Sequence, residues 1–314
     1  MDSLLFSLNA TVPVFLMMVL GMVFRRLGWM DRALAAKINT FVFRVPLPVL
    51  VFSDLASVDI ARAWDTKFVL FCFCATLLSI AIIWALSYVW RDRSIQGEFI
   101  QAGYRSSAAL LGTAFILNLY GTTGMAPLMM IGSVPLYNIM AVVVLSLFHK
   151  DRPGLDRQTM AKTLRGIVTN PILIGIAAGL AWSALRLDMP AILDKTLSNL
   201  GAVATPMGLM AMGASFDMKK AAGQSRPAVT AAFMKLVGLC ALFLPVAVAL
   251  GFREQELVAI VVMLGSATTV SSYVMATAMG HEGTLSASTV MLTTLFSAFT
   301  LTGWLWLVRA LGLI

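Results

Sequence analysis

Three basic side chains, Arg44, Arg105 and Lys235, lie inside otherwise apolar stretches of the chain. Each stands about seven to ten residues in from the nearer end of its stretch, or about 10–15 Å along a helix. A long cation at that depth either extends back to the lipid headgroups or serves a binding site. For Arg44 the two explanations are balanced, Lys235 is intermediate, and the serines beside Arg105 favour a site. Together the three would attract anions to one side of a membrane.

A dense run of hydroxyl side chains follows Gly265, with five in the seven residues 266–272: Ser266, Thr268, Thr269, Ser271 and Ser272. Hydroxyls in membrane helices usually bond to a carbonyl of their own helix or join two helices. A cluster this dense instead favours an unwound segment that binds a ligand. A half-helix that begins there would direct its N-terminal amides toward a bound carboxylate.

A second interruption is expected around Gly112 and Thr113. Asn118 follows this point by about one helical turn, and Asn138 lies in the middle of the next apolar stretch. An interhelical hydrogen bond explains either asparagine equally well, and Asn170 before Pro171 is expected to cap a helix. The candidate substrate-binding residues are therefore Arg105, Ser106, Ser107, Gly112, Thr113, Asn118, Asn138, Lys235, Thr268, Thr269, Ser271 and Ser272.

Acidic and histidine side chains are expected only near the ends of the apolar stretches, as at Asp54, Glu98, His149 and His281. An intramembrane enzyme needs a nucleophile with a base, or a set of metal ligands. The sequence therefore predicts no enzyme, no catalytic or metal site and no cofactor. Proton relays usually use a buried carboxylate or histidine, whereas hydroxyls and carbonyls suit sodium. Sodium and a proton both stay open as the coupling ion.

The elements that must position these residues are membrane helices. Of the 314 residues, 59% are hydrophobic and 12% are charged, and the mean hydropathy is +0.87. Soluble domains are about 45–50% apolar and about 25% charged, so soluble enzymes and nucleic-acid-binding modules are excluded. With about 20 apolar residues needed to cross a bilayer, we expect ten spans: 4–24, 38–53, 68–90, 95–117, 126–148, 166–185, 192–216, 229–250, 257–279 and 285–308.

The basic residues predict the orientation of these spans. Fourteen Lys and Arg fall in the loops after odd-numbered spans, and six fall in the remaining loops and the C-terminus. Because basic loops stay in the cytoplasm, we expect a multi-pass protein of the cell membrane with both termini outside. The loop 149–165 is then cytoplasmic.

An internal repeat is visible at a shift of 158 residues. The shift aligns two prolines and a glycine of the first half, Pro13, Pro48 and Gly21, with Pro171, Pro206 and Gly179. Because five spans separate the copies, the second copy enters the membrane from the opposite side, as in secondary transporters. We expect one inverted repeat over 1–153, a cytoplasmic linker over 154–165 and the second repeat over 166–314.

Four segments resemble the auxin efflux carrier family, which includes bacterial malonate-transporter-like members. They are P-x7-G from Pro13, L-P-x-x-V-F over 47–52, T-N-P-I-L-I-G-I-x-x-G-L over 169–180 and P-M-G-L-M-A-M-G-A-S over 206–215. The resemblance implies an all-α integral membrane fold of two inverted five-helix repeats. Broken helices 4 and 9 would cross at mid-membrane, as in bile-acid sodium symporters and sodium/proton antiporters.

The resemblance also implies a secondary carrier that moves a small organic anion, such as a mono- or dicarboxylate, by an elevator-like shift, and that forms a homodimer. This sequence has Gly112–Ala114 and Gly265–Thr269 where relatives carry crossover prolines. We still expect the crossing, because glycine and hydroxyls can satisfy the backbone groups that a helix break frees. The alternative function is a channel or membrane sensor without alternating access. The partners are then the anion, the coupling ion and the lipid bilayer, and no nucleic acid.

Overall fold

The computed structural model describes residues 2–57, 64–108, 113–121, 124–149, 166 and 168–314, and its regular elements in these ranges are helices. Five helical segments of this part are long and apolar enough to cross a membrane. They are Arg32–Ala56, Thr66–Ser87, Ala126–Leu147, Ser225–Ala249 and Thr284–Ala310, and Pro171–Ala184 is a shorter apolar helix. The expectation of an all-helical membrane fold is confirmed at this level.

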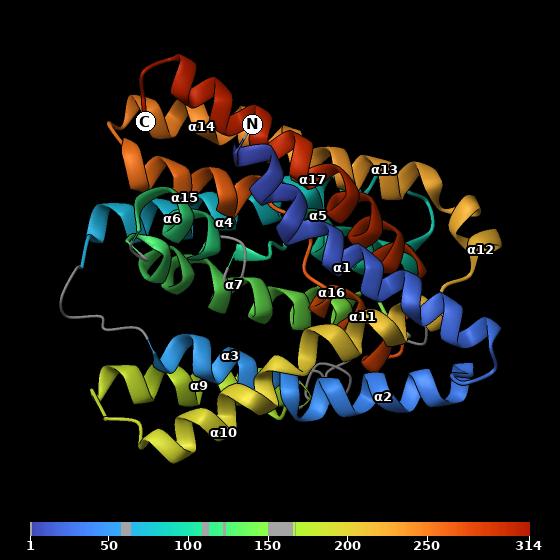
Figure 1. Cartoon of the computed structure of the whole chain (residues 1–314). Helices are drawn as coiled ribbons and strands as arrows, with labels where there is room; N and C mark the ends of the chain where they lie inside the picture. Colours follow the sequence, from blue (N-terminus) through green and yellow to red (C-terminus); the bar gives the residue numbers. More distant parts are fainter. Residues whose placement is uncertain (1, 58–63, 109–112, 122–123, 150–165, 167) are drawn as a thin grey trace.

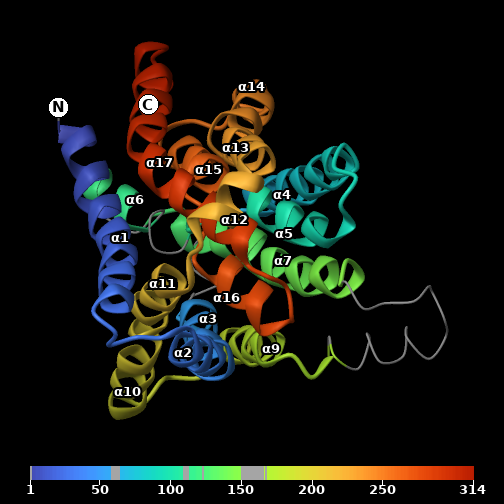
Figure 2. The same cartoon turned by 90° about the vertical axis from the view of Figure 1, so that its right-hand side faces the viewer.

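Most of the helices form two bundles, which Figure 2 shows side by side. The first bundle contains α1 (Asp2–Arg26), α2 (Arg32–Arg44), α3 (Pro46–Ala56), α9 (Pro171–Ala184), α10 (Ala191–Ala202) and α11 (Ala204–Ser215). The second contains α4 (Thr66–Ser87), α5 (Arg93–Tyr104), α6 (Thr113–Tyr120), α7 (Ala126–Leu147), α13 (Ser225–Phe233), the π-helix η2 (Met234–Gly238), α14 (Leu239–Ala249), α15 (Glu254–Gly265) and α17 (Thr284–Ala310). The short helix α12 (Met218–Gly223) leads from one bundle to the other, and α16 (Ser271–Ala278) packs against α2, α11 and α17.

Glycines allow the helices of the first bundle to approach closely. A Cβ atom on Gly21 of α1 would collide with the backbone of Met210 in α11, and one on Gly179 of α9 would collide with the backbone of Phe52 in α3. Small residues at such crossings let backbones approach within membranes, where lipid removes much of the hydrophobic drive. Asn170 caps α9 as predicted, because its side chain accepts a hydrogen bond from the Ile172 N–H at 3.0 Å.

Two kinds of helix interruption occur. In the first bundle, single residues separate α2 from α3 and α10 from α11, at Val45 and Val203. In the second bundle the chain leaves the helix for longer, after Tyr104 and after Gly265, and the next residues, Arg105 and Ser266, are extended. The first long interruption thus begins seven residues before the expected point at Gly112.

The two termini lie toward the same end of the molecule in Figure 1. The turn between α1 and α2 and the short helix α12 lie at the opposite end. Two termini on the same side of a membrane require that the chain cross it an even number of times.

Candidate functional site

The two long interruptions of the second bundle contact each other directly. The Ser107 N–H donates to the Ala267 carbonyl at 2.9 Å, and the hydroxyls of Ser106 and Ser266 share a hydrogen bond. These contacts join backbone and side-chain groups that a continuous helix would have satisfied within itself. The serines of the first interruption therefore help to hold the second in place.

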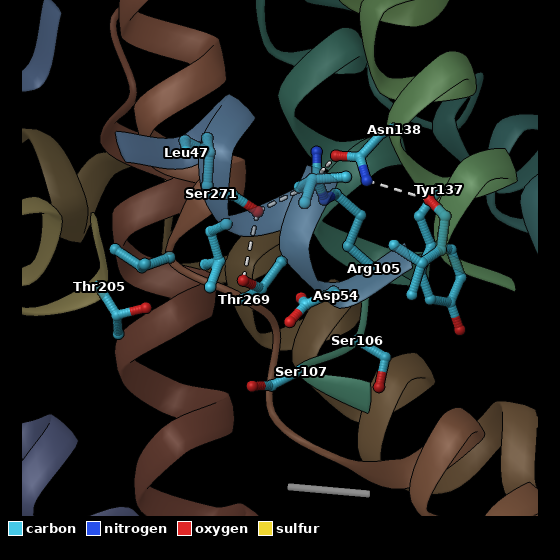
Figure 3. Close-up of a pocket in the computed structure, with 14 residues that line it drawn as sticks. Leu47, Asp54, Arg105, Ser106, Ser107, Tyr137, Asn138, Thr205, Thr269 and Ser271 are labelled. Carbon is cyan, nitrogen blue, oxygen red and sulfur yellow. Dashed lines mark hydrogen bonds between the residues drawn. The ribbon is translucent and has the colours of Figure 1, made fainter. Parts of the chain in front are cut away.

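A cavity of about 70 Å³ opens beside this junction, as Figure 3 shows. A water molecule needs roughly 10–15 Å³ by such a measure, so the cavity has room for a small ligand. Both bundles line it: Leu47, Leu50, Val51 and Asp54 from α3, Thr205 from α11, Val134, Tyr137 and Asn138 from α7, and Arg105, Ser106, Ser107, Thr269, Val270 and Ser271 from the interruptions and the start of α16.

Arg105 is the cation of this cavity, and its side chain is only 2% exposed. Its Nη2 donates to Asn138 Oδ1 at 2.8 Å and to Ser271 Oγ at 2.6 Å, and its Nη1 lies 2.7 Å from the Met275 sulfur. Its Nε has no hydrogen-bond partner among the residues that the structure describes. Within the described residues the ion pairs are Arg32–Asp217 and Lys220–Glu282, so no carboxylate there neutralises Arg105. A buried charge in this state is costly unless a ligand completes its contacts.

Neighbouring elements fix the position of the guanidinium. The Asn138 side-chain amide donates to the Val134 carbonyl of its own helix at 3.0 Å, which leaves Oδ1 facing Arg105. Ser271 Oγ accepts from Arg105 and donates to Thr269 Oγ1 at 3.2 Å. Because Ser271 begins α16, the positive end of that helix dipole also lies beside the cavity. The site thus combines a guanidinium, hydroxyls and a helix N-terminus, all of which favour an anion.

Lys235 does not line this cavity. It is fully buried in the π-helix η2, and its Nζ donates to the carbonyls of Met263 at 3.1 Å and Leu264 at 2.5 Å. Those carbonyls belong to the last turn of α15, where the helix leaves its acceptors without intrahelical donors. The ammonium therefore supplies hydrogen-bond donors to the C-terminal carbonyls of α15, at a place away from the cavity.

The remaining predicted site residues that the structure describes, like Lys235, do not line the cavity. Thr268 binds protein groups, because its N–H donates to Thr293 Oγ1 at 3.0 Å and its hydroxyl to the Ala102 carbonyl at 2.8 Å. Ser272 is buried, but it is not among the residues that line the cavity, and Asn118 is exposed on α6. Gly112 lies outside the described residues, as does the side chain of Thr113.

Three polar residues line the cavity that the sequence did not indicate: Asp54, Tyr137 and Thr205. Asp54 lies two residues before the end of α3, so its position in the sequence suggested a span end open to water. It is instead half-buried, and Figure 3 shows its carboxylate on the cavity with Arg105, Thr269 and Ser107. Only its spacing from Leu47 and Val51, at i+7 and i+3 on one helix face, could have indicated this.

The fold and this site define a multi-pass membrane transport protein rather than an enzyme. Residues 6–305 match the family described as "Membrane transport protein", and the chain therefore belongs to that family, the auxin efflux carriers. The chain is also similar to a protein of Rhizobium meliloti (strain 1021) named "Putative malonate transporter". The two are 25% identical over 310 residues, which cover 95% of each chain.

Proposed function

We propose that this protein is a secondary carrier that moves a small organic anion, a mono- or dicarboxylate, across the cytoplasmic membrane. The observation that carries the proposal is Arg105, which is buried on a cavity between two bundles and has no carboxylate partner among the described residues. A bound carboxylate would complete its contacts with charge-assisted hydrogen bonds. The name of the Rhizobium relative supports malonate as the first substrate to test.

The position of the cavity supports an elevator-like mechanism. Arg105 and Asn138 come from the second bundle, Asp54 and Thr205 come from the first, and Ser271 begins α16, which contacts both bundles. We infer that the second bundle carries the anion past α3 and α11, and the first bundle stays fixed. Each position would expose the cavity to one side of the membrane.

Helix boundaries and contacts support two inverted repeats. The single-residue interruptions at Val45 and Val203 lie 158 residues apart, as do both ends of α6 and α16. A two-fold axis requires that each close contact has a counterpart in which both residues are replaced by their repeat-related partners, and one such pair of contacts is present. Gly21 meets Met210 and Gly179 meets Phe52, where Gly179 lies 158 residues after Gly21 and Met210 lies 158 residues after Phe52.

The same relation leads us to infer ten spans with both termini outside and a cytoplasmic loop at 149–165. Membership of the family leads us to infer a homodimer through the first bundle. Ten spans place the termini on one side, in agreement with Figure 1. The charge bias assigns the other side to the cytoplasm. A cysteine at Gly154 that reacts with an impermeant reagent only after the cell is opened would support this orientation.

Counterflow in proteoliposomes tests the function. Vesicles loaded with unlabelled malonate should accumulate labelled malonate transiently, because a carrier exchanges substrate through alternating access. A channel equilibrates the label without overshoot, which would favour the alternative function. Sodium and proton gradients applied in the same assay identify the coupling ion. Vesicles with Arg105→Met protein serve as the control and should give no overshoot.

A further inference from the structure

Asp54 brings a negative charge to the cavity that the proposed anion would occupy. Its carboxylate, half-buried at the end of α3, forms no hydrogen bond or ion pair with any described residue. Arg105 lines the same cavity, but the two form no ion pair, because the guanidinium is directed toward Asn138 and Ser271. The cavity is therefore bounded by an unpaired cation and an unpaired anion.

This arrangement sets the chemistry of the ligand. A carboxylate suits the Arg105 side, where Nε has no partner among the described residues and Thr269 and Ser271 supply hydroxyls. The Asp54 side is an acceptor and repels negative charge. A fully ionised dicarboxylate would set its second carboxylate against Asp54, and like charges in so small a space do not both ionise readily. The ligand must offer a hydrogen-bond donor there.

We propose that the protein binds its dicarboxylate in the singly protonated form, with the carboxylate on Arg105 and the remaining carboxylic acid donating its O–H to Asp54. The inference rests on the proposed anion carrier and names its substrate class. One proton then crosses with each anion, bound to the substrate itself. Such a carrier responds to a proton gradient without a proton relay in the protein.

Few other ionisable side chains could take the role of Asp54. Among the described elements that pack against α3, α9 and α11 carry no charged side chain, and α10 carries Asp194 and Lys195, which are exposed. The charged residues of α2 are Arg32, Lys37 and Arg44. On the cavity itself the other ionisable groups are Arg105 and Tyr137.

Four ligands of similar size test the proposal on the unmodified protein in nanodiscs by calorimetric competition. At about pH 8 malonate carries two charges, whereas malonamate carries one and keeps an N–H donor where the acid would be. Monomethyl malonate carries one charge but has no donor, and β-alanine has an ammonium. We expect malonamate to bind at least about tenfold more tightly than malonate and monomethyl malonate, since each lacks one charged hydrogen bond. Malonate binding should strengthen as the pH is lowered and the singly protonated form appears.

The variant Asp54→Asn sharpens the test, because a neutral amide can donate to the second carboxylate of malonate. We expect the preference for malonamate to fall to about threefold or less, while Asp194→Asn, the same change on exposed α10, leaves it unaltered. If Asp54→Asn does not fold, the comparison of the four ligands still tests the proposal, because it uses the unmodified protein.

Three results would overturn the inference: malonate binding as tightly as malonamate at this pH, β-alanine binding best, or equal effects of the two asparagine variants. Absence of binding by all four ligands, together with no malonate counterflow, would instead count against the proposed function itself.

Discussion

Arg105 and Lys235 are both buried cations of the second bundle, yet their surroundings differ. Lys235 donates to two carbonyls at the end of α15 and has no contact with the cavity. Arg105 bonds to an amide oxygen and a hydroxyl, lines the cavity and has one nitrogen, Nε, without a partner among the described residues. Both side chains are buried, and what distinguishes them is whether every nitrogen already has an acceptor among the described residues.

The difference separates two roles that cations play at broken helices. A cation whose donors meet backbone carbonyls stabilises the break, because it replaces hydrogen bonds that the helix lost. A cation held by neutral side chains on a cavity keeps capacity for a ligand. Depth in the membrane does not distinguish them, and in the sequence only the serines beside Arg105 favoured a site there.

The largest expected effect follows replacement of Arg105 by methionine. Loss of a charged hydrogen bond should weaken malonate or malonamate binding by about 1.5–3 kcal/mol, or about 10–150-fold. The midpoint of unfolding should change little, because removal of a buried charge without a carboxylate partner offsets the loss of the donor to Asn138 and Ser271. Calorimetry and thermal unfolding on one preparation measure both quantities.

Arg105→Lys serves as the matched variant. It keeps the charge but cannot reproduce the planar fork that reaches Asn138 and Ser271 together. We expect affinity between those of the unmodified protein and Arg105→Met. Unchanged affinity in both variants would mean that the ligand does not contact Arg105.

Replacement of Lys235 by methionine should have the opposite pattern. The Leu264 carbonyl loses its side-chain donor, and the Met263 carbonyl keeps only the Tyr137 hydroxyl at 3.4 Å. We expect the free energy of unfolding to fall by about 1–3 kcal/mol while ligand affinity stays within about threefold. A loss of affinity with no loss of stability would move Lys235 into the binding site.

The smallest effects should come from two adjacent threonines. Thr269 lines the cavity, whereas the Thr268 hydroxyl bonds to the Ala102 carbonyl. Thr269→Val should weaken binding by about 0.5–1.5 kcal/mol with little change in stability, and Thr268→Val should lower stability by about that amount with little change in binding. Binding titrations and thermal unfolding of the two variants measure both quantities. If the two variants lost the same affinity and the same stability, the assignment of Thr269 to the ligand and of Thr268 to the protein would be wrong.

Much of the fold was predictable because lipid imposes strong rules on sequence. Long apolar stretches indicated the helices that are seen, and Asn170 before Pro171 indicated the cap of α9. The break was expected at Gly112, which lies outside the described residues, whereas the chain already leaves the helix at Arg105. The helix ends there because Ser106 and Ser107 bond across to Ser266 and Ala267, and these tertiary partners are distant in the sequence.

The candidate site was predictable only in part, because residue type indicated some of its side chains and tertiary packing placed the others. Arg105, Asn138, Thr269 and Ser271 were candidates by residue type, and all four line the cavity. Asn118 was also a candidate, but it points outward on α6. Asp54 was missed because its place on the cavity depends on how α3 packs against the second bundle, and its spacing from Leu47 and Val51 shows a shared helix face but not what that face contacts.

A crystal structure of the protein with bound malonate or malonamate tests the central claim most directly. The account predicts a carboxylate within hydrogen-bonding distance of Arg105, next to Thr269 and Ser271, with the other end of the ligand toward Asp54. A ligand bound beside Lys235, or one in this cavity that leaves the Arg105 guanidinium without an anionic partner, would contradict it.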